Sequence, residues 1–301
     1  MTKLAIVQAT PALFNKKKSI QIIRTWTKKA STKGAQLVLF PEAFIPCYPR
    51  GLSFGAVVGS RTAEGREHWL KYVSESIPVP GEEVNQLAEI AKEFQVFLCI
   101  GVIERGQTGS LYCTLLYFDP TGTLLGKHRK LKPTGSERII WGEGEGDDLN
   151  VYNTPLGRIG GLICWENYMP LARFALYQQG VQIYLAPTAD HRESWTASMQ
   201  HIACEGRCFV LSCNQLVRKQ DYPSEFQDEL SGFPEMMSRG GSVIVNPLGN
   251  IIAGPLWDKE GILFADIDIN DTVRGRLDFD ACGHYNRADV FEYQYKKKSF
   301  V

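Results

Sequence analysis

The sequence predicts an α/β fold in which two β-sheets pack against each other and helices cover their outer faces. Three observations lead to this prediction. Short apolar runs typical of strands recur along the chain, helical patterns lie between several of them, and three other connections contain the proline and glycine of tight turns. Strands that are joined by helices in some places and by hairpins in others are typical of packed sheets with helices outside.

The predicted elements extend over most of the chain. Strands are predicted at residues 3–8, 35–40, 96–103, 111–118, 158–164, 181–186 and 208–213, which are short apolar runs. Helices are predicted at residues 16–32, 82–94, 169–179 and 194–205, where apolar residues recur at helical spacing. Hairpins are predicted at residues 118–122, 153–157 and 245–250, because each combines proline with glycine between β-rich flanks.

Composition predicts one domain over residues 1–301, with residues 290–301 as a short C-terminal tail. The chain has 301 residues, 44% of them hydrophobic, and no Ser/Gly-rich or Pro-rich tract separates two apolar halves. Lys and Arg together number 33, as do Asp and Glu. This balance offers no argument for a nucleic acid or an anionic membrane as a partner.

The sequence also indicates a cellular compartment. No segment approaches the roughly 20 apolar residues that cross a membrane, and the apolar run at residues 4–7 is too short for a signal-peptide core. Eight cysteines in a chain of this length do not resemble a disulfide scaffold. We therefore expect a reducing, cytoplasmic location.

Cys164 is the most informative residue of the chain. It ends the apolar run of the segment Gly-Gly-Leu-Ile-Cys-Trp-Glu-Asn (residues 160–167), and a helical pattern follows. A thiol at a strand-to-helix turn is held rigidly, and its thiolate needs a proton acceptor and a positive potential nearby. The alternative is that Cys164 is a small buried hydrophobe, as most free cysteines are.

Two charged residues follow other predicted strands. Glu42 comes just after the strand at residues 35–40, and Lys130 lies in the cationic cluster at residues 127–130. Open α/β sheets gather their sites at strand ends, so Glu42, Lys130 and Cys164 form a coherent set of base, electrostatic stabiliser and nucleophile. Taken singly, Glu42 could be the acid of a helix N-terminus and Lys130 a solvated charge.

Two further motifs resemble ligand sites without having the required residues. The glycine-rich segment at residues 142–148 carries acids that would repel a phosphate, and it lacks the ligand pattern of a calcium loop. We interpret it as a turn beside the site. His201, Cys204 and Cys208 lie close in sequence, but the paired spacings of a metal site are missing. The sequence therefore predicts no metal and no organic cofactor.

These segments together resemble the nitrilase superfamily, and in particular its nitrilase branch. The resemblance extends from about Leu4 to about Asp289. It rests on Phe-Pro-Glu-Ala-Phe at residues 40–44, His-Arg-Lys-Leu-Lys-Pro-Thr at 128–134, Glu-Arg at 137–138, Trp-Gly-Glu-Gly at 141–144, Cys-Trp-Glu-Asn at 164–167 and Gly-His-Tyr at 283–285. The Cys-Trp-Glu segment is specific, because the family's amidases and carbamoylases usually have other residues after the cysteine.

The resemblance implies a fold, a reaction and roles for four residues. The fold is a four-layer α-β-β-α sandwich. By motif position Glu42 resembles the general base, Lys130 the catalytic lysine and Cys164 the nucleophile. Glu137 resembles a second glutamate that supports Lys130. The implied reaction hydrolyses an organic nitrile to the carboxylic acid and ammonia through a cysteine thioimidate and then a thioester.

Residues close to these motifs are candidates for substrate contacts. They are Tyr48, Trp141, Trp165, His191 and Trp195. Rigidity beside the nucleophile favours a packing role for Trp165, and residues 187–190 are expected to border the pocket because they follow another strand. The sequence does not choose among aromatic, arylaceto-, aliphatic and β-cyano-amino-acid nitriles.

Three alternatives to a nitrilase remain open. An amidase or carbamoylase would use the same triad, and a cyanide-converting enzyme is a second possibility. The third is an inactive member acting as an assembly or binding module, although the intact triad argues against it. The family also implies a homodimer or higher homo-oligomer. The helix at residues 169–179 is the candidate contact, and the short tail favours a dimer or short oligomer.

Overall fold

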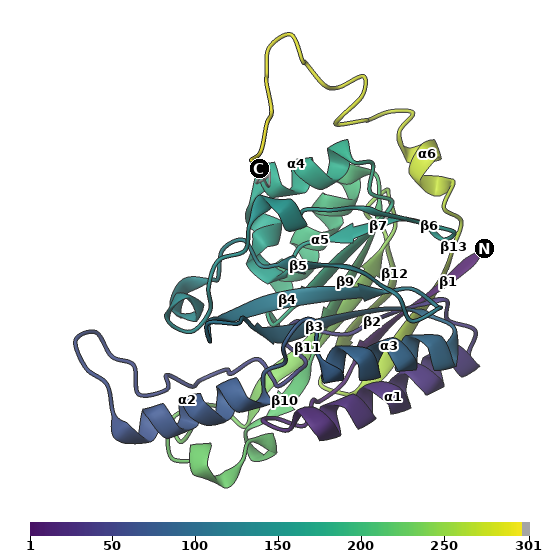
Figure 1. Cartoon of the computed structure of the whole chain (residues 1–301). Helices are drawn as coiled ribbons and strands as arrows, with labels where there is room; N and C mark the ends of the chain where they lie inside the picture. The colour runs from purple at the N-terminus through teal and green to yellow at the C-terminus, as the bar shows by residue number, and fades with distance from the viewer. Residues whose placement is uncertain (297–301) are drawn as a thin grey trace.

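The computed structural model, which describes residues 1–296, contains two β-sheets packed face to face with helices on both outer sides (Figure 1). The expected four-layer α-β-β-α sandwich is thereby confirmed. The first sheet has six strands in the order β13 (Gly261–Ile267), β1 (Thr2–Gln8), β2 (Leu37–Leu39), β3 (Phe97–Arg105), β4 (Leu111–Phe118) and β5 (Leu124–Arg129). Helices α1 (Lys16–Thr32) and α3 (Glu82–Phe94) cover its outer face.

The second sheet has the order β10 (Leu216–Arg218), β11 (Met236–Val245), β9 (Phe209–Asn214), β8 (Ile183–Thr188), β7 (Gly157–Gly161) and β6 (Tyr152–Thr154). Strand β12 (Ile251–Trp257) also pairs with β11. Helices α4 (Pro170–Gln178) and α5 (Glu193–Gly206) cover the outer face of this sheet. Helix α2 (Ala63–Glu75), helix α6 (Asp271–Gly275) and five 3₁₀ turns complete the described elements.

Side-chain alternation along the strands builds three hydrophobic layers. On β2, Leu37 and Leu39 enter the core between the two sheets, whereas Val38 points to the core beneath α1 and α3. This is the period of two that a strand with both faces buried requires. Complete burial of one such side chain contributes about 1.5–3 kcal/mol to folding. The core between the sheets holds each of them in place at the edge where the candidate site lies.

The parallel strands determine where the polar loops meet. Strands β1, β2 and β3 are mutually parallel in the first sheet, and β7, β8 and β9 are parallel in the second. The three predicted hairpins are confirmed, since β4–β5, β6–β7 and β11–β12 are antiparallel neighbours. The loops after β2, β5, β7 and β8 then carry the residues that the sequence analysis selected.

Some predicted elements differ from those observed. The strand predicted at residues 158–164 ends at Gly161, and Cys164 begins a 3₁₀ turn, η3 (Cys164–Tyr168), ahead of α4. Strands β5 and β10–β13 were not predicted, nor was α2, which buries only Gly65 and Tyr72. A helix with so few buried residues shows little apolar periodicity, so its sequence gives a weak signal.

The C-terminal segment lies against the helix that follows Cys164. Residues 290–296 have no strand or helix, and the remainder of the predicted tail, residues 297–301, lies outside the described residues. The Tyr293 hydroxyl donates to the Leu171 carbonyl at 2.7 Å, and the Tyr293 ring contacts Phe174 edge-on. Within residues 1–296, no helix combines the length and apolar character needed to cross a membrane.

Candidate active site

Glu42 lies in the loop after β2 and is completely buried. The loop is fixed to β3, because the Gly101 N–H donates to the Pro41 carbonyl at 3.1 Å and the Phe44 N–H donates to the Gly101 carbonyl at 2.8 Å. A Cβ at residue 101 would lie 2.4 Å from the Pro41 carbonyl oxygen and 2.6 Å from the Glu42 Cα. Only glycine permits this close approach, which directs the Glu42 side chain into the site.

Lys130 directly follows β5 and is also buried. Its N–H donates to the Cys113 carbonyl and its own carbonyl accepts from the Gly144 N–H, both at 2.8 Å. A Cβ at residue 144 would lie 2.1 Å from the Arg129 carbonyl oxygen, so the close packing of this segment requires a glycine. The glycine-rich segment is therefore an irregular stretch that contacts Lys130 and leads into the 3₁₀ turn η2 (Gly146–Asp148), where the sequence analysis predicted a turn beside the site.

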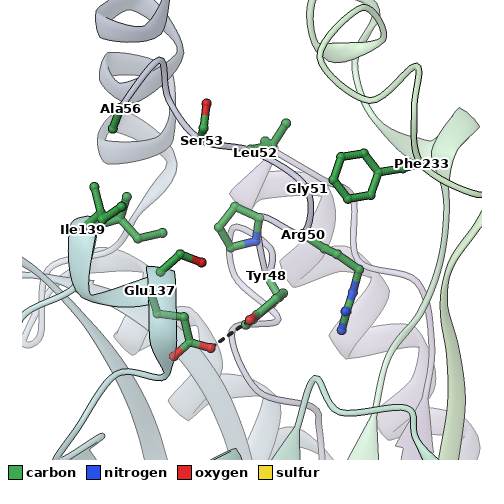
Figure 2. A pocket seen from close by; sticks show the side chains of 12 residues that line it. Tyr48, Arg50, Gly51, Leu52, Ser53, Ala56, Glu137, Ile139 and Phe233 are labelled. Atoms are coloured by element: carbon green, nitrogen blue, oxygen red, sulfur yellow. Dashed lines mark hydrogen bonds between the residues drawn. The ribbon is translucent and has the colours of Figure 1, made fainter. Parts of the chain in front are cut away.

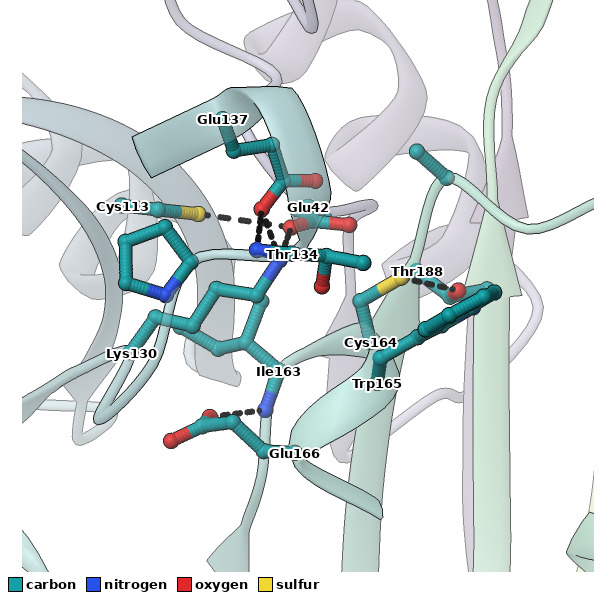
Figure 3. Close-up of polar contacts among 12 residues, drawn as sticks. Glu42, Cys113, Lys130, Thr134, Glu137, Ile163, Cys164, Trp165, Glu166 and Thr188 are labelled. Atoms are coloured by element: carbon teal, nitrogen blue, oxygen red, sulfur yellow. Dashed lines mark hydrogen bonds and ion pairs between the residues drawn. The ribbon is translucent and has the colours of Figure 1, made fainter. Parts of the chain in front are cut away.

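The Lys130 ammonium group joins two carboxylates (Figure 3). Its Nζ donates to Glu42 Oε1 at 2.8 Å and to Glu137 Oε2 at 2.7 Å. Glu137 stands on the turn η1 (Gly135–Ile139), and its Oε2 also accepts the Thr134 N–H at 2.7 Å. The Tyr48 hydroxyl donates to Glu137 Oε1 at 2.8 Å, so both oxygens of Glu137 are engaged.

Cys164 has a strained backbone at the start of η3. Its φ angle is +51°, in the left-handed region that residues other than glycine rarely adopt. The Asn167 side-chain amide holds this turn by donating to the carbonyls of Leu162 and Cys164 at 3.0 and 2.7 Å. The Thr188 hydroxyl, at the end of β8, donates to Cys164 Sγ at 3.1 Å (Figure 3). Backbone strain held by surrounding contacts is frequent at reactive residues.

The charges of the site determine its protonation states. Burial raises the pKa of Glu42 above 4.5; Lys130 opposes this rise and Glu137 adds to it. Burial lowers the pKa of Lys130, but the neighbouring Glu42, Cys164 and Glu137 outweigh it and raise that pKa well above 10.5. Burial and the Glu42 carboxylate raise the pKa of the Cys164 thiol, so at neutral pH this thiol is protonated.

A protonated thiol requires a base, and Glu42 has an oxygen available for that role. Its Oε1 accepts from Lys130 Nζ and from the Cys113 thiol, the latter at 3.5 Å. Among the described residues, no hydrogen bond of ordinary geometry engages the buried Oε2, and the Cys164 side chain interacts with the Glu42 carboxylate closely enough to lower its pKa. Figure 3 shows that this oxygen points to the side of the site where Cys164 lies.

Cys164 opens onto a cavity of about 260 Å³. The cavity is lined by Tyr48, Arg50, Thr134, Glu137, Cys164, Trp165, Ala189, Asp190, His191 and Arg192. A second cavity, of about 470 Å³, shares Tyr48, Arg50 and Glu137 with the first, and Leu52, Ile139 and Phe233 add apolar surface to it (Figure 2). The three shared residues show that the two cavities adjoin each other.

The structure brings most of the predicted wall residues to this cavity, but not all of them. Tyr48 and His191 line the cavity. Residues 189 and 190 of the segment predicted to border the pocket line it as well. Trp141 is buried behind Tyr48, with the two rings edge-on at 5.8 Å, and it does not line the cavity. Trp195 is a correction: it faces the second sheet from α5, and its Nε1 donates to the Ser212 hydroxyl at 2.7 Å.

Trp165 lines the cavity and is 40% exposed. Its indole N–H donates to Asp190 Oδ2 at 2.9 Å, and the Arg192 guanidinium lies 4.8 Å from its ring centroid. Trp165 therefore packs against Arg192 and Tyr168 and also contributes exposed surface to the cavity, so the expected packing role describes only part of its environment.

Arg50, Thr134 and Arg192 are lining residues that the sequence analysis did not select. Arg192 is paired with Asp190, whereas Arg50 donates to the Ala189 carbonyl and lies over the Tyr48 ring. The segment Tyr-Pro-Arg-Gly at residues 48–51 was the only signal for Arg50. Its position follows from the packing of a loop, which no local pattern predicts.

The residues considered for a metal site do not gather. Cys208 is buried, whereas the His201 side chain is 68% exposed. Across residues 1–296, no three or more His, Cys, Asp or Glu side chains are grouped so that they could hold a metal ion.

Known sequences relate this site to a family. The family model described as carbon-nitrogen hydrolase matches residues 3–276. An aliphatic nitrilase from Sinorhizobium fredii (strain HH103) is 49% identical over 295 residues, covering 97% of this chain and 95% of that protein. A bifunctional nitrilase/nitrile hydratase from Nicotiana tabacum is 49% identical, with 96% and 84% covered. Nitrilase 1 from Arabidopsis thaliana is 45% identical, with 99% and 89% covered.

Solved structures share the fold. A carbon-nitrogen hydrolase from Helicobacter pylori G27 has a TM-score of 0.76 at 20% identity, and 96% of each chain is covered. An amidase from Nesterenkonia sp. AN1 has a TM-score of 0.69 at 20% identity, covering 92% of this chain and 98% of that one. The chain therefore belongs to the carbon-nitrogen hydrolase family. Its sequence relatives are nitrilases, the branch that the Cys-Trp-Glu segment indicated.

Proposed function

We propose that this protein is a nitrilase that converts an organic nitrile to the carboxylic acid and ammonia, with Cys164 as nucleophile. The observation that carries the proposal is a thiol that opens onto a cavity beside a buried Glu42–Lys130–Glu137 cluster. Sequence relatives named as nitrilases support the substrate class over the amidase, carbamoylase and cyanide alternatives. A complete site also argues against a purely assembly role.

The first step forms a thioimidate. Glu42 takes the proton from the Cys164 thiol through its free oxygen, and the sulfur attacks the nitrile carbon. One π bond of the C≡N group breaks, a C–S bond forms, and Glu42 returns the proton to the nitrogen. The Lys130 ammonium group and the backbone N–H of Trp165 stabilise the negative charge that develops on that nitrogen.

Two additions of water complete the reaction. Glu42 removes a proton from the first water, whose oxygen adds to the thioimidate carbon to give a tetrahedral intermediate. The nitrogen takes this proton from Glu42 and becomes an amino group. The C–N bond then breaks while the hydroxyl oxygen becomes the carbonyl oxygen; the hydroxyl proton passes through Glu42 to the leaving nitrogen, ammonia departs, and a thioester remains. The second water attacks in the same way, the C–S bond breaks, and the carboxylic acid leaves while Cys164 regains its proton.

Three neighbouring groups hold this machinery. Glu137 keeps Lys130 between two carboxylates, and the Tyr48 hydroxyl engages the remaining oxygen of Glu137. Burial raises the pKa of Tyr48 well above its ordinary value, so this hydroxyl keeps its proton and acts as a donor. The Thr188 hydroxyl stabilises sulfur-centred negative charge during attack and departure.

The tetrahedral intermediate can break in a second way. If the C–S bond breaks before the C–N bond, the product is the amide, as in a nitrile hydratase reaction. Relatives named as bifunctional nitrilase/nitrile hydratases make this branch relevant here. The ratio of acid to amide then reports whether nitrogen or sulfur is protonated first.

We further propose a cytoplasmic enzyme that acts as a homodimer or larger homo-oligomer on a small-molecule nitrile, as one domain and without a cofactor. Part of the predicted contact helix is available for association: Leu171 is 67% and Met169 37% exposed, and the adjacent Tyr168 is 41% exposed. Ala175 and Tyr177, further along the same predicted helix, are buried within the chain. The proposed contact between two copies of the chain is therefore restricted to the start of α4.

The test is ammonia release from a panel of aromatic, arylaceto-, aliphatic and cyano-amino-acid nitriles and from the matching amides. We expect turnover of nitriles, and none by Cys164→Ala, which removes only the sulfur. Mass spectrometry of a slow nitrile substrate should find an adduct on the Cys164 peptide. Cys113→Ala is the matched control, because this buried thiol also contacts Glu42. A preference for amides, or an adduct on another cysteine, would contradict the proposal.

A further inference from the structure

Glu166 lies next to the site but does not line its cavity. Its side chain is buried, and each carboxylate oxygen accepts a backbone N–H. Oε1 accepts from Leu131 N at 2.5 Å, and Oε2 accepts from Ile163 N at 2.7 Å, the second bond being drawn in Figure 3. His128 Nε2 lies 3.1 and 3.0 Å from the same two oxygens. The carboxylate is therefore fully occupied within the protein.

The two backbone partners of Glu166 are sequence neighbours of reacting groups. Leu131 follows Lys130 at the end of β5, which is the edge strand of the first sheet. Ile163 precedes Cys164 after β7, which belongs to the second sheet. Strands β5 and β7 are not paired with each other. One carboxylate thus bridges the two sheets at the peptide units beside the lysine and the cysteine.

We infer that Glu166 is a positioning residue that fixes the Cys164 thiol relative to the Lys130 ammonium group. This inference rests on the proposed function, in which Lys130 stabilises charge on an atom attached to Cys164. The two groups come from separate sheets, so their spacing depends on whatever connects the two loops. Charge-assisted hydrogen bonds from a carboxylate to backbone N–H groups are short and directional, which suits that task.

His128 is the side-chain partner of Glu166, and its Nε2 faces both carboxylate oxygens. Burial lowers the pKa of His128, but Glu166 and Asp148 outweigh this and raise it above 6.5. A buried carboxylate that is held by an imidazole nitrogen and two backbone N–H donors is restrained at both of its oxygens. The bridge also restrains the strained turn at Cys164, in addition to the hydrogen bonds that Asn167 donates there.

If Glu166 positions the Cys164 thiol, its substitution should lower kcat by more than any loss of stability explains. In Glu166→Gln only one oxygen remains, so one of the two N–H groups must face an amide NH₂. We expect kcat for the best nitrile to fall about 100-fold while KM changes by less than about threefold, because the chemical step depends on alignment more than binding does.

Glu104→Gln is the matched control. Glu104 is equally buried and takes hydrogen bonds from Arg129 and Lys127, close to the same strand end, but it accepts no backbone N–H beside a reacting group. This variant should lose stability in urea unfolding while its kcat stays within about threefold of the parent. If Glu166 were only structural, both variants would lose activity in proportion to stability.

Glu166→Asp keeps the test decisive if the glutamine variant does not fold. The shorter side chain retains the charge that His128 requires and can reach Ile163 in its own turn, but not Leu131 as well. We expect iodoacetamide to alkylate Cys164 at the parent rate while kcat falls strongly. Full kcat in either Glu166 variant would overturn the inference. Parent and Cys164→Ala are assayed alongside, so failure of the proposed reaction is recognised separately.

Discussion

At the scale of single residues, one cation serves two buried carboxylates. Lys130 pairs with Glu42 and Glu137, and all three side chains are removed from water. Burial of charges is costly unless they are paired, so the cluster retains one negative charge that the surrounding protein must tolerate. Burial is the main reason why the pKa of Glu42 is raised and Glu42 remains a stronger base than an exposed glutamate, and the like charge of Glu137 adds to this effect.

The first residue-scale prediction concerns the identity of the lysine. Lys130→Arg should lower kcat by about 100-fold or more, because a wide planar guanidinium cannot replace a compact ammonium group between two carboxylates. Lys132→Ala should retain activity within about threefold of the parent, since Lys132 is exposed and pairs only with Glu143. Steady-state kinetics on folded variants measures both, and the reverse order would assign the role to Lys132.

The second residue-scale prediction concerns pH. Because Glu42 must be ionised to act as a base and its pKa is raised above 4.5, kcat/KM should be lost as the pH falls through that raised value. Removal of the like charge in Glu137→Gln lowers the pKa of Glu42. The acid limb of its residual kcat/KM should therefore move to lower pH. If the acid limb stayed at the same pH or moved to higher pH, the ionisation of a group other than Glu42 would control it.

At the scale of elements, loops and turns hold the reacting groups at strand ends. Glu42 depends on the contact between its loop and β3, Lys130 on the hydrogen bond from Gly144, and Cys164 on the turn η3. Each loop is fixed by backbone hydrogen bonds, which are directional and leave little freedom. Changes in the strand beneath a loop should therefore affect catalysis without touching a reacting atom.

The element-scale prediction is made for β3. Gly101→Ala would place a methyl group 2.4 Å from the Pro41 carbonyl and 2.6 Å from the Ala43 nitrogen, so the Glu42 loop must shift. We expect kcat/KM to fall about 100-fold for a displacement near 1 Å, and stability to fall by about 1–3 kcal/mol from overpacking. Gly232→Ala is the control, since within residues 1–296 no atom outside its two chain neighbours lies within 4 Å of its added Cβ. Parent-like activity in Gly101→Ala would mean that the position of this loop does not determine the position of the Glu42 carboxylate.

At the scale of the whole molecule, the site is located where both sheets meet and where α4 begins. Helix α4 follows the Cys164 turn directly, and its first residues include the exposed Leu171 and Met169. A second copy seated on this surface would press on the turn that carries the nucleophile. Association and activity would then be linked.

The prediction at this scale uses Leu171→Asp. A charge in the proposed contact should shift the protein from a dimer or short oligomer to a monomer in light scattering, and specific activity should fall with it. Leu277→Asp is the control, because Leu277 is 88% exposed and lies away from α4 near the end of α6. A parent protein that is a fully active monomer at low concentration would refute the proposed contact.

The sequence alone was sufficient for the layers of the fold and for the members of the central cluster. Short apolar runs such as the one that contains Leu37-Val38-Leu39 are typical of strands with both faces buried, and the Pro/Gly turns mark hairpins by local backbone chemistry. The order of Glu42, Lys130 and Cys164 at strand ends was also readable, since parallel strands bring their carboxyl ends together. Each of these signals lies within a short segment of the chain and depends on the chemistry of that segment alone.

Only the tertiary structure decided which side chains meet. Trp195 was expected at the pocket wall, but its spacing with Met199 and Ile202 places it on the buried face of α5, a helical signal that proximity to a motif concealed. The bond from Lys130 to Glu42 joins residues 88 positions apart, and that from Leu131 to Glu166 spans 35 positions between two sheets. Such contacts depend on how the sheets pack, and packing is a property of the whole chain that no short pattern encodes.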